Sequence, residues 1–327
     1  MSIVTRLNRA ARELLGRTQG PREVPRASSY EEQIYQTLVR PGDTCFDVGA
    51  NGGNVSLYLA KLVGESGLVM AFEPVWPIYR QLCRTVQRDT AMKAPIVTIP
   101  CGLADSERRA AMNVPDGEFA MGSLADPSAW ARAQRGATLR SYPVQLTTVD
   151  EFLASTASRD PDFIKIDVEG AELFVLHGAA ELFSAGHRPL MLIEVFAPWE
   201  RAFGYQPWAP LSWLLERGYR FMFACPNGMV EHLPTEATPF PANYEMGYNV
   251  VVYDPTAHAE RIDGLQHLRA GARLALLPMA PPPQPNHLAE PGATPDPARA
   301  GTELLGLDSP VPSGSGTTQP FTQHRPG

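Results

Sequence analysis

Short apolar runs alternate with amphipathic segments from Asp43 to about Asp254. The apolar runs are rich in β-branched and aromatic residues, a composition typical of buried strands. They lie at 44–48, 68–72, 96–101, 163–167, 190–196, 219–225 and 248–253. Apolar residues recur at helical spacing near 53–63, 76–88, 170–184 and 210–217. This order of strands and helices predicts an α/β fold, in which a mostly parallel sheet carries helices on both faces.

Residues 106–153 interrupt this alternation. The segment contains Gly117, Gly122 and Gly136 and the alternating stretch "YPVQLTTV". Alternation of apolar and polar residues is typical of a strand with one exposed face. We therefore expect an inserted hairpin or loop region over the sheet edge, where a substrate would be enclosed.

The two ends of the chain differ from the middle. Residues 1–30 are rich in Arg, and apolar residues at helical spacing in 1–16 leave two interpretations open: a helix lying on an anionic membrane, or a helix packed on the domain. The last fifty residues hold 12 Pro and 6 Gly, too many for a packed core. We expect an N-terminal leader at 1–30, one domain at 31–255 and a largely disordered tail at 256–327.

Composition narrows the class of protein. The net charge of -7 and a pI near 5.6 argue against nucleic acid as the main partner, because phosphate binding needs a basic surface. The four cysteines show neither CxxC nor zinc-binding spacing, which is typical of reduced thiols in a cytoplasmic protein. No apolar run reaches the roughly 18–20 residues that cross a bilayer.

The stretch "FDVGANGGN" places a glycine-rich turn between a predicted strand and a predicted helix. Such a turn lets a ligand approach the backbone at the helix N-terminus. A dinucleotide fingerprint would carry glycine where Asn51 stands, and Asp47 before the turn would repel phosphates. Both residues suit a cationic ligand without phosphates, such as S-adenosylmethionine. Asp47 would then lie beside its amino-acid portion, with Gly49 and Gly53 providing clearance.

Two further acidic residues follow the next strands. The stretch "GLVMAFEP" places Glu73 at a strand end, 20 residues beyond Gly53, and a carboxylate there suits the two hydroxyls of a ribose. Asp105 is the last residue of "VTIPCGLAD", after the third strand, and could accept a hydrogen bond from the adenine amino group. Three such signals, each at a strand end, favour S-adenosylmethionine as the cofactor over simple turn chemistry.

The stretch "FIKIDVEGAELFVLHGA" gathers four ionisable residues at the end of a central strand. Strand alternation places Lys165 and Asp167 on one face, and Glu169 and Glu172 follow. Open α/β sheets bind ligands at this end of their strands. The alternative is structural: Lys165 pairs with Asp167, and the two glutamates stabilise the first turn of a helix.

These motifs together resemble the FkbM family of S-adenosylmethionine-dependent methyltransferases over roughly residues 31–253. The resemblance implies a class I methyltransferase fold, Rossmann-like, with seven strands of which the last, 248–253, is antiparallel. It implies cofactor contacts from Asp47, Gly49, Asn51, Gly53 and Glu73, and a reaction centre at Lys165, Asp167 and Glu169. The stretch "MGSLAD" is similar to a Ser-Leu element of the family, which implies that Ser123 and Leu124 lie near the adenosine.

The family typically methylates a hydroxyl, so the resemblance implies an O-methyltransferase acting on a sugar, glycolipid or polyketide-type molecule. Removal of the hydroxyl proton needs a base, for which Asp167 is the first candidate and Glu169 the second. Lys165 would tune Asp167 or orient the substrate oxygen. We expect no metal, although Asp167, Glu169 and Glu194 form an alternative Mg²⁺ or Ca²⁺ site.

Other interpretations remain open. Five aromatic residues in "VFAPWERAFGYQPWAP" would either stack on a substrate or pack on the sheet. The competing functional classes are a nicotinamide-dependent Rossmann oxidoreductase and a non-catalytic module that binds S-adenosylmethionine. The acceptor and the oligomeric state are not indicated by the sequence.

Overall fold

The computed structural model describes residues 29–89, 94–115, 122–124, 139–156, 158–225, 228–241 and 248–268. The chain divides into two compact units, residues 1–281 and 282–327, and every described residue belongs to the first. Residues 1–28 of the expected leader and 269–327 of the expected tail lie outside the described residues.

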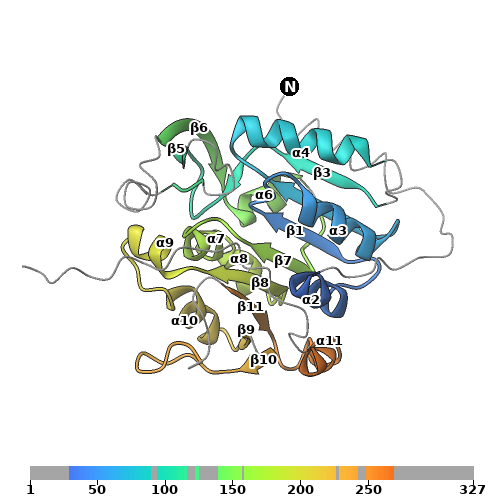
Figure 1. Ribbon diagram of the computed structural model, residues 1–327, viewed down its shortest axis with the longest axis vertical. Helices are drawn as coiled ribbons and strands as arrows, with labels where there is room; N and C mark the ends of the chain where they lie inside the picture. The colour runs from blue at the N-terminus through green and yellow to red at the C-terminus, as the bar shows by residue number, and fades with distance from the viewer. Residues whose placement is uncertain are drawn as a thin grey trace, which may run out of the picture. The chain divides into compact units, whose positions relative to one another are not determined.

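Eight of the described strands form the main sheet (Figure 1). Their order is β10 (Gly228–Glu231), β9 (Arg220–Cys225), β11 (Tyr248–Tyr253), β8 (Leu190–Val195), β7 (Phe163–Ile166), β1 (Thr44–Val48), β2 (Leu68–Phe72) and β3 (Ile96–Ile99). The five strands from β3 to β8 are parallel, and β11 is antiparallel to both of its neighbours. The expected number of seven is therefore wrong by one strand, since β10 adds a hairpin partner to β9.

The central strands are buried along their whole length, as expected for parallel strands covered on both faces. Two charged residues interrupt these apolar runs. Asp47 of β1 lies opposite Lys165 of β7 in the register of the sheet, and both side chains are buried. Buried charges are stable only when paired, so this register brings a compensating pair into the centre of the sheet.

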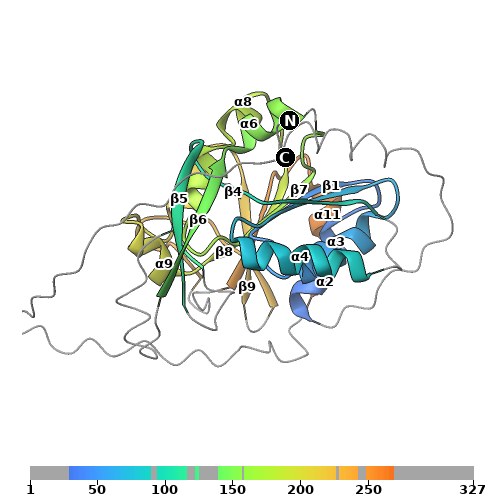
Figure 2. The same ribbon diagram turned by 90° about the horizontal axis from the view of Figure 1, so that it is seen from above.

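Helices cover both faces of the sheet (Figures 1 and 2). On one face lie α2 (Tyr30–Leu38), α3 (Asn54–Val63) and α4 (Trp76–Arg88). On the other lie α6 (Val149–Thr156), α7 (Glu172–His177), α8 (Ala180–Ser184) and α10 (Ala209–Leu215). The helix predicted over 170–184 is divided into α7 and α8 near Gly178. A Cβ atom at Gly178 would lie 2.0 Å from the carbonyl oxygen of Ala104, so the chain passes very close to its neighbour there.

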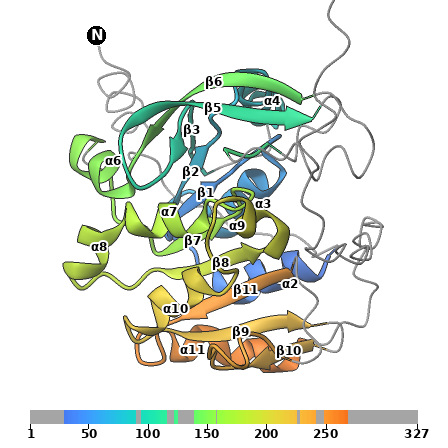
Figure 3. The same ribbon diagram turned by 90° about the vertical axis from the view of Figure 1, so that its left-hand side faces the viewer.

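A second sheet of three strands lies beside the β3 edge (Figures 2 and 3). It consists of β4 (Gly102–Leu103), β6 (Leu139–Thr147) and β5 (Arg108–Pro115), with β5 antiparallel to β6. These strands fall largely within residues 106–153, where the sequence predicts an inserted hairpin. Ser123 forms an isolated antiparallel bridge with Asn113 of β5.

The folded region continues past the expected boundary at residue 255. Residues after β11 form α11 (Ala259–Ile262) and the 3₁₀ helix η2 (Asp263–His267). Arg261 pairs with the buried Asp43 at 2.6 Å, and Leu265 is fully buried in the core shared with α2. The first part of the segment assigned to the tail is therefore integral to the domain.

Candidate active site

A cavity of about 430 Å³ lies at the carboxyl ends of β1, β2, β7 and β8. This volume is in the usual range for small-molecule sites. It is bounded by the glycine turn (residues 49–53), the start of α4, the small sheet and the β7–α7 turn (residues 167–171). The predicted site residues that line it are Gly49, Asn51, Gly53, Glu73, Leu124, Lys165, Asp167 and Glu169. The structure thus brings together motifs that are more than a hundred residues apart.

The glycine turn depends on its glycines for contacts within the protein. Gly49 has φ +84°, and a Cβ atom there would lie 1.9 Å from the carbonyl oxygen of Asp167. Gly53 has φ +90°, and its Cβ would lie 2.6 Å from the side chain of Leu82. Both glycines also line the cavity, so their absent side chains let the turn pack against the β7–α7 turn and α4, and clearance for a ligand stays a prediction.

Glu73 is fixed at the cavity wall by two backbone donors. The N–H groups of Asn51 and Val75 donate to its two carboxylate oxygens at 3.1 and 2.8 Å. Burial raises the pKa of Glu73 to about 7, although both hydrogen bonds lower it. Each oxygen keeps a further lone pair, so the carboxylate can still accept hydrogen bonds from the cavity side.

Lys165 is buried between two carboxylates. Its Nζ lies 2.8 Å from Oδ2 of Asp167 and 3.9 Å from Oδ1 of Asp47. Burial alone would lower the pKa of Lys165, but the two carboxylates outweigh it and raise the pKa. Lys165 therefore stays charged. Asp47 is fully buried and accepts a hydrogen bond from the Ser56 hydroxyl at 2.5 Å. It therefore lies behind the cavity wall, and none of its atoms is exposed to make the ligand contact expected of it.

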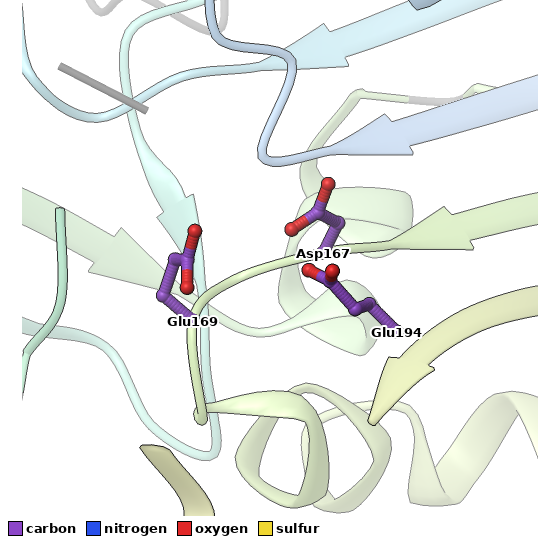
Figure 4. A group of neighbouring side chains, drawn as sticks. All are labelled: Asp167, Glu169 and Glu194. Carbon is purple, nitrogen blue, oxygen red and sulfur yellow. The ribbon is translucent and has the colours of Figure 1, made fainter. Parts of the chain in front are cut away.

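Asp167, Glu169 and Glu194 bring carboxylate oxygens within 4.8 Å of one another (Figure 4). Burial would raise the pKa of Asp167, but the Lys165 ammonium outweighs it and lowers the pKa. Burial, together with the Asp167 charge, raises the pKa of Glu169 and of Glu194 well above the usual range. Glu194 shares a hydrogen bond with Asp167, and two carboxyl groups can do so only when one of them carries a proton.

The same three carboxylates could hold a divalent cation, because hard cations such as Mg²⁺ and Ca²⁺ prefer oxygen ligands. Acidic groups at a cavity are equally suited to an organic cation. The metal site therefore remains an alternative, as it was from the sequence.

The other predicted residues lie elsewhere. Asp105 is exposed and pairs with Arg108 at 2.5 Å, outside the residues that line the cavity. Ser123 is fully buried and donates from Oγ to the carbonyl oxygen of Glu169 at 2.8 Å. It thus contacts the β7–α7 turn, whereas its neighbour Leu124 faces the cavity.

A second group of acids lies behind the β7–α7 turn. Oε1 of Glu172 accepts from the N–H groups of Val168 and Gly170, each at 3.2 Å. Glu200 is fully buried on α9 (Ala197–Ala202) and accepts from the Phe196 N–H at 2.9 Å. Burial raises the pKa of Glu172 to about 7 and that of Glu200 to about 8. The sequence places Glu172 among the four ionisable residues of this motif, either at a ligand site or at the start of a helix, and gives no signal for Glu200.

The aromatic residues after β8 favour the packing interpretation over the substrate one. The rings of Phe203 and Tyr205 lie 5.5 and 6.0 Å from the ring of Phe174 on α7. Neither lines the cavity. The cavity wall that the sequence does not predict is mostly apolar and comes from the start of α4 and the small sheet, namely Val75, Ile78, Leu103, Met112 and Leu146.

The model of the methyltransferase FkbM domain family matches residues 47–221, more than half of the chain. This match covers both the glycine turn and the β7–α7 turn. The chain belongs to the FkbM methyltransferase family. The predicted family is therefore confirmed. The mostly parallel sheet with an antiparallel β11 agrees with the class I methyltransferase fold of that family, with the extra strand β10 as its departure.

Similar solved structures are remote in sequence. A methyltransferase FkbM from Methylobacillus flagellatus KT is 18% identical, with 76% of this chain and 59% of that chain covered and a TM-score of 0.41. This chain thus spans less than two thirds of that protein's length. An O-methyltransferase from Thermotoga maritima is 14% identical, with 76% and 71% covered and a TM-score of 0.36. A fibrillarin from Aeropyrum pernix, solved with bound S-adenosyl-L-methionine, is 14% identical, with 73% and 86% covered and a TM-score of 0.36.

No curated protein matches the chain. Within the part of the chain that the structure describes, we find no helix with the length and apolar character needed to cross a bilayer.

Proposed function

We propose that this FkbM family member transfers a methyl group from S-adenosylmethionine to a hydroxyl group of a small molecule. The observation that carries the proposal is one cavity shared by the glycine turn, Glu73 and the Lys165–Asp167–Glu169 group. One end of that cavity suits an adenosine and the other suits proton removal. The acceptor class that we favour is a sugar, glycolipid or polyketide-type molecule.

The charge of the cavity supports S-adenosylmethionine as the methyl donor. Four acidic side chains line it, and Lys165 is the single cation among the described lining residues. The phosphates of a nicotinamide dinucleotide would keep these carboxyl groups protonated and meet no cation other than Lys165, whereas a ligand that carries a sulfonium and an ammonium group would favour their ionised form. Glu73 would hold the ribose hydroxyls, and the backbone of the glycine turn would approach the amino-acid portion. When bound, the cofactor supplies an electrophilic methyl group.

Glu169 is the better candidate for the base. A general base works best when its pKa lies near the working pH, which requires a carboxyl group with a raised pKa. Lys165 lowers the pKa of Asp167, which makes that carboxylate a weak base, whereas burial raises the pKa of Glu169, so that its ionised form is the stronger proton acceptor. Glu194 is engaged in a hydrogen bond with Asp167 and is therefore less free to take the hydroxyl proton. This reverses the order of candidates drawn from the sequence.

Asp167 then orients the acceptor. Its side chain is one-third exposed toward the cavity and is charged, so it can accept a hydrogen bond from a hydroxyl group. Glu169 takes the hydroxyl proton as the oxygen attacks the methyl group. Lys165 stays protonated and keeps Asp167 ionised. Alignment of the oxygen with the methyl group supplies much of the rate.

A non-catalytic module that only binds the cofactor is the second candidate. The ordered Lys165–Asp167 pair at 2.8 Å and the convergence of three carboxyl groups at one end of the cavity speak against it, since cofactor binding alone needs neither.

The experiment is a transfer assay with tritium-labelled S-adenosylmethionine and a panel of sugars, catechols and hydroxylated macrolides. We expect label on one class of acceptor and none above background with Glu169→Gln. Retention of cofactor binding without transfer to any member of a broad panel would favour the non-catalytic module.

A further inference from the structure

The β7–α7 turn has an unusual backbone. Glu169 has φ +54°, a left-handed conformation that few residues other than glycine adopt, and Gly170 follows with φ +97°. A non-glycine residue held there is strained by its own backbone, and such a conformation persists only where surrounding contacts impose it. In this turn the strained residue is the one whose carboxyl group lines the cavity.

Three side chains from three separate segments impose this conformation. Ser123 donates to the Glu169 carbonyl at 2.8 Å, and the hydroxyl of Tyr205 donates to the Gly170 carbonyl. Glu172 accepts from the N–H groups on either side of Glu169, those of Val168 and Gly170. Four backbone groups of the turn are therefore bound by side chains.

Ser123 and Tyr205 are themselves held in place. The backbone of Ser123 exchanges two hydrogen bonds with Asn113 of β5, at 2.9 and 3.0 Å. Tyr205 packs on Phe174, and its backbone N–H donates to the Glu200 carbonyl at 3.4 Å. Burial and two nearby glutamates raise the pKa of Tyr205, so its hydroxyl stays a donor. The small sheet and the segment after α9 are thus both tied to one turn.

We infer that Ser123, Glu172 and Tyr205 are positioning residues that hold Glu169 in its left-handed conformation and aim its carboxyl group at the acceptor. This role presupposes the methyl transfer proposed above, in which Glu169 is the base. It also gives Ser123 a role other than the adenosine contact that the family resemblance implies. Loss of the Tyr205 or Ser123 hydroxyl should lower kcat and leave cofactor binding unchanged.

The first test needs no acceptor. Hydrogen exchange of the peptide covering residues 163–175 would be compared between the wild type, Tyr205→Phe and Ser123→Ala. The matched controls are Tyr219→Phe and Ser155→Ala, whose hydroxyls also donate to backbone carbonyls, at 3.2 Å, but away from the cavity. We expect exchange in the turn to be roughly fivefold faster in the two test variants, as for loss of one net hydrogen bond, and unchanged in the controls. Equal exchange in all five proteins would overturn the inference.

The second test is a kinetic cycle with an acceptor from the panel. Tyr205→Phe and Ser123→Ala should each lower kcat by about 10- to 100-fold, the range for a misplaced catalytic group, with the KM for S-adenosylmethionine unchanged. In a Glu169→Gln background the same changes should have almost no further effect, because the group they position is gone. Full additivity would show that they act on something other than Glu169. If exchange is faster in the two test variants but the wild type transfers no methyl group to any acceptor, the result would support the hold of these side chains on the turn and would count against the proposed function instead.

Discussion

The glycine turn and the β7–α7 turn face the same cavity, but different contacts hold them. The glycine turn is held by groups close to it in sequence: the N–H groups of Gly49 and Ala50 both donate to the Phe72 carbonyl, that of Gly53 donates to the Ala50 carbonyl, and that of Asn51 donates to the Glu73 carboxylate. The β7–α7 turn is held by the side chains of Ser123, Glu172 and Tyr205. The first arrangement forms within about thirty residues, whereas the second needs segments from across the chain.

This difference matches the two tasks proposed for the cavity. A cofactor common to a family can be held by local backbone geometry. A base must be placed within a few tenths of an ångström of an acceptor, and residues from several segments can adjust that position. The comparison predicts that substitutions on the two sides will separate binding from chemistry.

Glu169→Gln should give the largest loss. It removes the base and keeps the shape of the side chain, so kcat should fall by roughly 100- to 10,000-fold. Single-turnover methyl transfer would measure it, with the exposed Glu181→Gln as the matched control. A decrease in kcat of less than about tenfold would mean that Asp167 or a water molecule, and not Glu169, takes the proton.

Gly49→Ala should disturb both the glycine turn and the β7–α7 turn. The added Cβ atom would lie 1.9 Å from the Asp167 carbonyl oxygen, and the backbone of residue 49 is in a left-handed conformation. We expect the free energy of unfolding to fall by more than about 3 kcal/mol, measured by urea titration. Gly186→Ala is the control: its φ is +92°, but no atom lies within 4 Å of the added carbon, so only the backbone strain of about 1 kcal/mol remains. Equal losses in the two variants would mean that the contact between the turns is unimportant.

Glu200→Gln should stabilise the protein at high pH. The folded-state pKa of Glu200, about 8, lies above the value of about 4.3 in an unfolded chain. Its contribution to stability is therefore present at low pH and is lost as the pH rises from about 4.3 to about 8.

Gln keeps the acceptor for the Phe196 N–H and removes the titration. The decline in unfolding free energy between pH 5 and pH 8 should be smaller by roughly 2–3 kcal/mol in the variant. The control is Glu216→Gln, whose side chain is 77% exposed. If the unfolding free energies of wild type and Glu200→Gln changed with pH in the same way, Glu200 would not titrate with a raised pKa in the folded protein.

Most of the fold follows from local patterns. Continuous apolar runs predict the seven strands correctly to within two residues, because parallel strands covered on both faces need such runs. β10 escapes prediction because its four residues are only partly buried and show no clear period. The division between α7 and α8 escapes it too, since it depends on the close approach of Gly178 to Ala104, which lies far away in the sequence.

The site residues, too, fall into those that local sequence patterns predict and those that depend on distant contacts. The motifs around Gly49, Glu73 and Asp167 could be assigned from the sequence because strand ends in a parallel sheet meet at one edge. The positions of Ser123 and Tyr205 could not, because each depends on how a long connection folds back over the β7–α7 turn. The order of Asp167 and Glu169 as bases could not either, because it depends on burial and on the distance to Lys165.

The division of labour between the two sides is tested most directly by calorimetric titration of S-adenosylmethionine into wild type, Glu73→Ala and Glu169→Gln, with methyl transfer measured on the same samples. Glu73→Ala should bind roughly 10- to 100-fold more weakly, as for loss of hydrogen bonds to a charged group. Glu169→Gln should bind within twofold of wild type and transfer no measurable methyl group. Unchanged binding in Glu73→Ala, or binding lost in Glu169→Gln, would contradict the account.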